Sequence, residues 1–222
     1  MKNITLIIPA KYEKESLPEV LLELKKYSFK ILVILEPTDY ETIDSIKNFE
    51  CKIIHQTNKG YGNALILGIK NVKTDYFCIF NADGSFNPTE ILGMYNKLKN
   101  EDKDIIFASR YEKNAGSDDD TLITKTGNFI FTALGKFLFR LPITDILYTF
   151  VLGKTKMVLD LNLQSQDFTF CVELPIKAQR KNYKISSIPS YERIRIAGKK
   201  KVNAIRDGFY ILKKMIFMFF KD

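Results

Sequence analysis

The chain lacks any apolar segment that reaches the ~18 residues needed to span a bilayer, so we expect no membrane-spanning helix. It has three cysteines, which are widely spaced and lie in apolar runs: Cys51, Cys78 and Cys171. This pattern argues against a disulfide framework or a zinc site and predicts reduced, buried thiols in a cytoplasmic protein. A single Lys precedes the first apolar run, so no signal peptide is expected. Repeats and low-complexity tracts are also lacking, which favours one domain for the 222 residues.

Basic residues outnumber acidic ones, 34 to 26, which gives a formal net charge of +8. Phosphates, anionic lipid and nucleic acid are therefore all candidate partners. Residues 193–206 contain six of the basic residues and no acidic one, although such a run can also be a solvated loop. Nucleic acid is the least favoured partner, because aromatic residues are scarce in this stretch and no known nucleic-acid-binding module is visible.

Short apolar runs alternate with amphipathic segments along the first half of the chain. The runs typical of buried strands lie at residues 4–9, 31–35, 52–55, 76–80 and 105–109. This alternation predicts an α/β fold with a mainly parallel, doubly wound sheet and helices on both faces. Polar clusters follow the ends of these runs, and parallel strands end at one edge of a sheet, so the clusters are expected to converge.

Residues beyond the fifth run follow a different pattern. We expect a charged, mobile loop at 112–120 and a Phe-rich helix at 127–139, which is either a core helix or an interfacial one, with the core favoured. A last strand is expected at 184–189. Two acidic residues lie in apolar surroundings. Asp145 is either a helix cap or functional, and Glu173 is either paired or functional, because an unpaired buried charge is costly.

One strand end carries the strongest candidate site. The stretch at 77–88, FCIFNADGSFNP, changes abruptly from an apolar run to small polar residues. Asp83 has oxygen-bearing neighbours in Asn81 and Ser85, and Gly84 lets the backbone come close. This set suits Mg²⁺ or Mn²⁺ carrying a phosphate, and the alternative is an ordinary turn. Gly60 and Gly62 could likewise cradle a phosphate or simply begin a helix, since neither a full G-x-G-x-x-G pattern nor a P-loop is present.

The last segment, 205–222, predicts an amphipathic helix. Apolar residues share one face, and basic residues lie largely opposite: Ile205, Phe209, Leu212, Ile216 and Phe219 against Arg206, Lys213, Lys214 and Lys221. Such a helix fits a membrane interface, a position on the domain of residues 1–204, or a homodimer contact.

Together these segments resemble family 2 glycosyltransferases of the GT-A (nucleotide-diphospho-sugar transferase) fold, and most closely the dolichyl- or polyprenyl-phosphate mannosyl- and glucosyltransferases. Residues 7–13 resemble the opening I-P-A-y-N-E, and residues 59–64 resemble n-k-G-x-G-x-A. Residues 81–83 fall on the D-A-D metal motif, and residues 109–111 match S-R-Y. Asp145 falls on the acid of D-x-x-x-G-f, while Glu173 and residues 189–201 fall on f-x-x-E-l and v-P-…-R-x-x-G-x-S-K.

The chain departs from the family pattern in several places. Asn81 replaces the first Asp of the metal motif, which should lower metal affinity, and Tyr12 replaces the usual Asn. Residues 35–38 replace D-D-g-S after the second strand, and the Gly of the acceptor segment is missing. A non-catalytic module that binds a sugar nucleotide is therefore an alternative to an active enzyme.

The resemblance implies an inverting enzyme that takes a sugar from a GDP- or UDP-linked donor, with Mg²⁺ or Mn²⁺. A polyprenyl phosphate is the favoured acceptor, and a glycan hydroxyl in surface polysaccharide synthesis is the alternative. The protein would be cytoplasmic and peripheral on the inner face of the cell membrane. The residues implied for nucleotide binding are Pro9, Ala10, Tyr12, Glu13, Glu36, Lys59, Gly60, Asn81, Ala82 and Asp83. Those implied for catalysis are Asp83, Asp145, Arg110, Arg195 and Lys201; for the metal Asp83, Asn81 and Ser85; and for the acceptor or a phosphate Lys125, Glu173 and Lys200.

Overall fold

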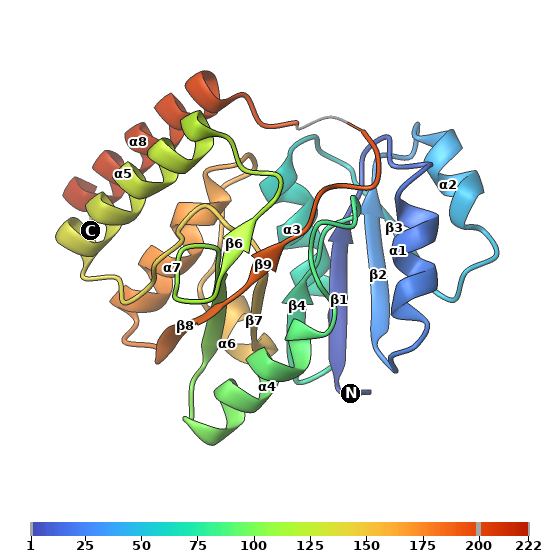
Figure 1. Cartoon of the computed structure of the whole chain (residues 1–222), viewed down its shortest axis with the longest axis horizontal. Coiled ribbons are helices and arrows are strands. Elements are labelled where there is room, and N and C mark those ends of the chain that lie inside the picture. The colour runs from blue at the N-terminus through green and yellow to red at the C-terminus, as the bar shows by residue number, and fades with distance from the viewer. Residues whose placement is uncertain (1, 199–200, 222) are drawn as a thin grey trace.

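A computed structural model describes residues 2–198 and 201–221 of the chain (Figure 1). Within these residues, one sheet holds seven strands in the order β3-β2-β1-β4-β7-β5-β8. A second, two-stranded sheet pairs β6 with β9. The strands are β1 (Ile4–Pro9), β2 (Lys30–Leu35), β3 (Lys52–His55), β4 (Tyr76–Ile79), β5 (Ile105–Ser109), β6 (Gly116–Ser117), β7 (Val151–Lys154), β8 (Ile185–Pro189) and β9 (Tyr191–Glu192).

The large sheet is parallel except at β7, which pairs antiparallel with both β4 and β5. The predicted α/β fold with a mainly parallel sheet is therefore confirmed. The sequence analysis missed β7, because its four residues lie in a longer apolar segment and only long-range pairing sets their direction. Val151 lies opposite Ile79 on one side and opposite Phe107 on the other, so β7 joins the two halves of the sheet.

Helices cover both faces of the sheet, as the alternating pattern predicted. Successive residues of β1 point to opposite sides, so that Ile7 joins one buried cluster while Leu6 and Ile8 join the other. One cluster includes residues of α1 (Leu17–Leu24), α2 (Tyr40–Ile46) and α4 (Glu90–Asn100). The other includes residues of α3 (Tyr61–Asn71), α5 (Leu122–Phe139), α6 (Thr155–Asp160), α7 (Phe170–Arg180) and α8 (Ala204–Lys221).

Helices α5 and α8 lie side by side as the outermost layer on their face of the sheet (Figure 1). The inward side of α8 consists of Ile211, Met215 and Met218, all of which are buried. The apolar face that the sequence predicts, which includes Phe209 and Ile216, points to solvent. Helix α5 begins earlier than expected. One side of it packs on the core, as favoured from the sequence, and several of its other apolar residues are exposed.

The segment expected to be a mobile loop at 112–120 is tied down. Gly116 and Ser117 form β6, and the backbone of Asp118 donates to the Glu192 carbonyl over 2.9 Å. The Tyr191 hydroxyl donates to the Asp118 carboxylate over 2.6 Å. These bonds fix the acidic run at 118–120 beside the strand ends, where it contributes to the candidate site.

Candidate active site

The polar clusters that follow the strands converge on one edge of the sheet, as predicted. In the parallel pairing, Pro9 of β1 lies opposite Ile34 of β2, and Ser109 of β5 lies opposite Pro189 of β8. The ends of β1, β2, β4, β5 and β8 therefore face the same way. Ligands of open α/β sheets bind at this edge, outside the carboxyl ends of the strands.

The turn that follows β4 satisfies most of its own hydrogen bonds. The Asn81 amide donates to the Ser85 hydroxyl, and its oxygen accepts from the Phe86 backbone over 3.3 Å. Asp83 Oδ1 accepts from the Ser85 backbone over 3.0 Å. The other carboxylate oxygen of Asp83, Oδ2, lies 3.5 Å from Nη1 of Arg195. Asp83 is thus the charged group that this turn presents at the sheet edge.

Residues 193–198, which we name the basic strap, cross directly over this turn. The backbone of Arg193 donates to the Ser85 carbonyl, and that of Ile196 donates to the Asp83 carbonyl, each over 2.8 Å. Gly84 has φ = 82°, and a Cβ at that position would lie 2.5 Å from Cδ1 of Ile196. Only glycine fits, because both the left-handed backbone and the close approach exclude a side chain.

Arg195 is the strap residue whose charged side chain lies in the site. Its Nη2 lies 2.6 Å from Asp119, in addition to the contact of Nη1 with Asp83. The hydrogen bond to Asp119 is the main cause that raises the pKa of Arg195 above its usual value, followed by burial, which opposes it, and by the charge of Asp83. The guanidinium therefore stays charged and bridges two carboxylates from different segments.

The loop after β1 forms the neighbouring wall. Glu13 is buried, accepts from the Ser16 hydroxyl over 2.6 Å, and forms an ion pair with Lys201. Tyr12 has φ = 55° and its backbone donates to Asp39 over 2.7 Å, which leaves its ring 67% exposed. A pocket of about 110 Å³ lies between this loop and residues 197–198 of the strap. Glu36, just after β2, pairs with Lys11 of the same loop over 3.0 Å.

The two glycines at the start of α3, Gly60 and Gly62, have a packing role in this structure. A Cβ at Gly60 would lie 2.1 Å from the Gln166 carbonyl oxygen, and one at Gly62 would lie 2.2 Å from the Ser165 carbonyl oxygen. The Gln166 carbonyl also accepts from the Asn63 backbone over 3.0 Å. The first turn of α3 is therefore covered by the chain itself, and Lys59 is exposed just before it.

Arg110 and Asp145, both predicted to act in catalysis, form a buried ion pair. Arg110 Nε lies 2.7 Å from Asp145 Oδ2, and Nη2 lies 3.0 Å from Oδ1. Nη1 of Arg110 also lies 3.2 Å from Glu192, and the ring of Tyr148 lies under the guanidinium. Burial would lower the pKa of Arg110, but the two carboxylates raise it above its usual value. The side chains are 11% and 0% exposed, so neither faces open space.

Comparison with known proteins identifies the family of this chain. A profile of glycosyl transferase family 2 matches residues 5–161. This chain belongs to glycosyl transferase family 2. Similar proteins include an uncharacterised protein of Methanocaldococcus jannaschii, 25% identical, with 96% of this chain and 91% of the other covered. They also include the UDP-N-acetylglucosamine–dolichyl-phosphate N-acetylglucosaminyltransferase of Methanococcus voltae, 26% identical, with 85% of this chain and 84% of the other covered.

Solved glycosyltransferase structures share the GT-A fold with this chain. Glucosyl-3-phosphoglycerate synthase of Mycobacterium tuberculosis, crystallised with Mn²⁺, UDP and glucosyl-3-phosphoglycerate, superposes with a TM-score of 0.74. It is 11% identical, and 98% of this chain and 80% of that chain are covered. Mannosyl-3-phosphoglycerate synthase of Rubrobacter xylanophilus also gives 0.74, at 10% identity, with 97% and 73% covered. The predicted family and GT-A fold are both confirmed.

The metal donors that this family 2 glycosyltransferase offers are few. Within residues 2–198 and 201–221, no group of three or more His, Cys, Asp or Glu side chains could hold a metal ion. Asp83, the Asn81 amide oxygen and the Ser85 hydroxyl form a set of oxygen donors with a single charge. Such a set fits Mg²⁺ or Mn²⁺ when a ligand's phosphates supply the remaining oxygens, since these ions prefer oxygen.

Glu173 and Lys125, which the sequence also predicts for the site, belong to α7 and α5 and not to the Asp83 turn. Glu173 is buried, accepts from the backbone of Ser165 over 2.6 Å, and pairs with Lys177 over 2.8 Å. It therefore fixes the loop that covers α3. Lys125 is exposed on α5, whereas Lys200 lies outside the described residues. The sequence analysis did not single out Asp119, whose contact with Arg195 joins positions 76 residues apart.

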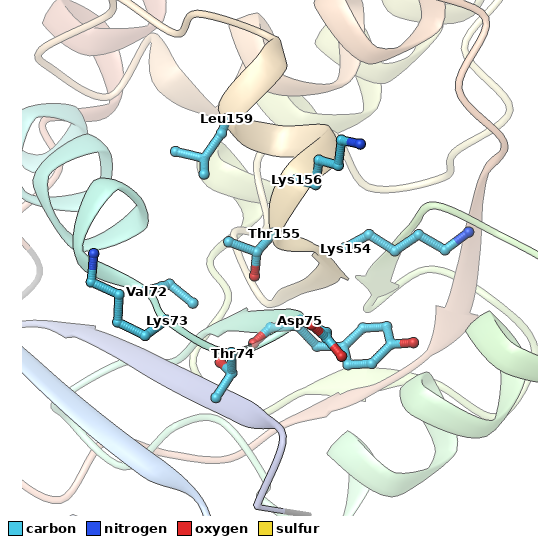
Figure 2. A pocket seen from close by; sticks show the side chains of 9 residues that line it. Val72, Lys73, Thr74, Asp75, Lys154, Thr155, Lys156 and Leu159 are labelled. Carbon is cyan, nitrogen blue, oxygen red and sulfur yellow. Dashed lines mark hydrogen bonds between the residues drawn. The ribbon is translucent and has the colours of Figure 1, made fainter.

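A separate pocket of about 580 Å³ lies at the opposite edge of the sheet (Figure 2). Its walls come from the residues just before β4, including Thr74 and Asp75, and from the end of β7 and the start of α6, including Lys154 and Thr155. Because it opens away from the strand ends that carry Asp83 and Arg195, we assign it no part in sugar transfer. Elsewhere, none of the helices traced in residues 2–198 and 201–221 has the length and apolar character to cross a membrane.

Proposed function

We propose that this glycosyltransferase moves a sugar from a UDP- or GDP-linked donor to a polyprenyl phosphate, with inversion at the anomeric carbon. The observation that carries the proposal is the pairing of two cations with carboxylates at the sheet edge: Arg195 of the strap with Asp83, and Lys201, which follows the strap, with Glu13. The diphosphate of a donor is negatively charged, as these carboxylates are. It can therefore replace them as the partner of the two cations. Preorganised cations stabilise the charge that grows on the leaving nucleotide.

The donor site lies between the β1 loop, the β4 turn and the strap. Pro9, Ala10 and Ala82 supply backbone at the strand ends, while Glu13 and Glu36 face the nucleoside. The exposed ring of Tyr12 offers the base an aromatic surface for stacking. The pocket beside Glu13, about 110 Å³, is smaller than the ~300 Å³ typical of ligand sites. Donor binding therefore requires the strap to move away from Asp83.

Asp83, with Asn81 and Ser85, would hold a Mg²⁺ or Mn²⁺ ion against the donor phosphates. When bound, the ion offsets the negative charge of the leaving diphosphate. The chain itself contributes the Asp83 carboxylate, which points to this position. Arg195 leaves that carboxylate when the donor binds. Both Mn²⁺ and Mg²⁺ occur in crystals of the Mycobacterium tuberculosis synthase, which has the same fold.

A phosphate acceptor is favoured because Asp145 and Glu173, the acids that could serve as a general base, are already engaged. Both oxygens of Asp145 accept from Arg110, and Glu173 holds the backbone of Ser165 and Gln164. A sugar hydroxyl would need a positioned base, whereas a lipid phosphate is already ionised at neutral pH. The relative from Methanococcus voltae has dolichyl phosphate in its name, which agrees with this proposal.

The deciding experiment is a donor screen with purified protein, with and without Mn²⁺, against a short polyprenyl phosphate and against an oligosaccharide. We expect turnover of one UDP- or GDP-sugar with the lipid phosphate, and none with the oligosaccharide. Transfer to the oligosaccharide alone would instead favour a glycan acceptor.

A second candidate function is a non-catalytic module that binds sugar nucleotides. Asn81 favours it, because the amide is turned toward Ser85 and adds no charge to the metal site. The same screen separates the two functions when nucleotide binding is measured alongside turnover. Tight binding of a UDP- or GDP-sugar with no product on any acceptor would support the module and reject the enzyme.

A further inference from the structure

Helices α5 and α8 present a continuous apolar surface to solvent. On α5 the exposed side chains Ile123, Ile130 and Phe137 recur at every seventh position, and on α8 Ile205, Leu212 and Phe219 do the same. Phe137 is 83% exposed and Ile205 is 85% exposed. A seven-residue spacing places side chains on one face of a helix. We name this surface, formed by the six side chains, the α5–α8 platform.

The platform is a fixed part of the fold, because both helices are anchored through their other sides. Met215 and Met218 of α8 are buried in the core cluster, and Arg180 of α7 donates to the Met218 carbonyl. The rings of Phe139 and Phe219 meet at the last turns of α5 and α8, with their centroids 6.1 Å apart. The two helices thus run in the same direction, side by side (Figure 1).

The exposed charged side chains on the two platform helices have one sign. Helix α5 contains no acidic residue, and the acid of α8, Asp207, is buried and accepts from the Asn203 backbone over 2.7 Å. The exposed charged side chains of the two helices include Lys125, Lys136 and Lys213. A second copy of this surface would bring like charges together, whereas an anionic lipid surface attracts them. Charge therefore favours a bilayer over a self-contact.

We propose that α5 and α8 together dock the protein on an anionic membrane, with the platform side chains buried at the level of the headgroups. This extends the sequence expectation from residues 205–222 to a surface built by two helices. Amphipathic helices with apolar and basic sides bind reversibly in this way. The reason for docking depends on the proposed lipid acceptor, but membrane binding by the platform does not.

The platform also lies next to the donor site. Helix α5 begins just after Asp119, which holds Arg195, and α8 begins just after Lys201, which holds Glu13. A protein docked through these helices would hold the basic strap near the headgroups. A lipid phosphate could then reach the strap cations while its chain stays in the bilayer.

The test is flotation of the full chain with vesicles of phosphatidylcholine, with and without phosphatidylglycerol, at low and high salt. One variant changes α5, Ile130→Ser with Phe137→Ser, and another changes α8, Ile205→Ser with Leu212→Ser. The control, Leu22→Ser with Leu92→Ser, removes apolar side chains of comparable size that are 55% and 48% exposed on α1 and α4. Circular dichroism and UDP binding, measured on every variant, confirm that each one folds.

We expect the wild-type chain and the control to float with anionic vesicles and to dissociate as salt rises. Each platform variant should lower the partition coefficient by about tenfold or more, since the loss of buried apolar area weakens interfacial binding. Wild-type protein that never floats would overturn the proposal, and so would a loss confined to the α8 variant. A wild-type dimer that the platform variants dissociate, without any vesicle binding, would assign the surface to self-association. Failure of the donor screen with normal flotation would reject the proposed function alone.

Discussion

The guanidinium of Arg195 lies 3.5 Å from the Asp83 carboxylate, the side chain that the sequence predicts to hold a metal ion. The same guanidinium binds Asp119 over 2.6 Å. A divalent cation at Asp83 would repel the guanidinium of Arg195, because both are positively charged and lie close together. The donor's diphosphate can resolve this conflict, since it binds both the ion and Arg195. Donor and metal are therefore expected to bind together and to displace the strap.

The first prediction concerns this carboxylate. Asp83→Ala should abolish turnover and keep the fold, because Asp83 is the charged donor that the β4 turn offers. Asn81→Asp should tighten Mn²⁺ binding, since it adds a second carboxylate to the same turn. Isothermal titration with Mn²⁺ and UDP, together with a turnover assay, measures both effects. Wild-type activity in Asp83→Ala would remove Asp83 from the mechanism.

The second prediction separates two arginines that the sequence places in the same role. Arg195→Lys keeps the charge but loses the planar fork that matches phosphate oxygens. We expect kcat/KM to fall roughly tenfold, which corresponds to about 1.4 kcal/mol, with little change in stability. Arg110→Lys should instead lower the free energy of unfolding by about 1–3 kcal/mol, because Asp145 and Glu192 lose buried hydrogen bonds.

Kinetics and urea denaturation on both variants distinguish these outcomes. An Arg110→Lys variant of normal stability and reduced kcat/KM would return Arg110 to the catalytic role that the family resemblance implies. An Arg195→Lys variant with unchanged kinetics would place Arg195 outside the donor site.

The sequence was sufficient to predict the fold and the edge of the sheet at which the polar clusters converge, because both depend on local patterns. Apolar runs and turn residues mark the strand ends, and parallel pairing brings Glu13, Asp83 and Arg195 to one edge. Contacts between distant positions were not predictable in this way. Arg110 lies 82 residues from Glu192, and nothing in the local pattern shows that they meet. The close approach of Gln166 to Gly60 is likewise visible only in three dimensions.

The buried side of helix α8 could not be predicted from local sequence patterns either. Its apolar residues occupy more than half of the helix surface, so periodicity alone does not say which side packs against the domain. The structure buries Ile211, Met215 and Met218 and exposes Ile205 and Phe209. The choice depends on contacts with α5 and α7, which the sequence pattern of α8 does not contain.

This orientation of α8 leads to the third prediction. Deletion of residues 205–222 would remove three side chains that are buried in the core, at about 1.5–3 kcal/mol each. A total of roughly 5–9 kcal/mol is comparable to the whole stability of a domain. We therefore expect the truncated chain to aggregate or unfold, as seen by size-exclusion chromatography and circular dichroism. A truncated chain that stays monomeric and binds UDP would mean that α8 is dispensable for folding.

The last prediction concerns Glu173 and pH. Burial alone would raise its pKa, but the hydrogen bonds from Lys177 and Ser165 hold the pKa of Glu173 below its usual value. A carboxyl whose pKa is lower in the folded state stabilises the fold fully above its unfolded pKa of about 4.3 and loses this contribution as pH falls through the folded pKa. Glu173→Gln should therefore cost about 1–3 kcal/mol at neutral pH, because the ionic hydrogen bonds are lost.

The difference between Glu173→Gln and the wild type should shrink as pH falls below the usual carboxyl range. Glu101→Gln is the matched control, because Glu101 pairs with Lys97 over 2.8 Å with the same four-residue spacing but at the surface. Exposed pairs contribute little, so the control should behave like the wild type at each pH. Urea denaturation of the three proteins between neutral and acidic pH measures the effect. The loss in the free energy of unfolding caused by Glu173→Gln could instead stay constant across this range. That result would mean that the loss comes from altered packing or geometry, and not from the missing charge that holds the loop over α3.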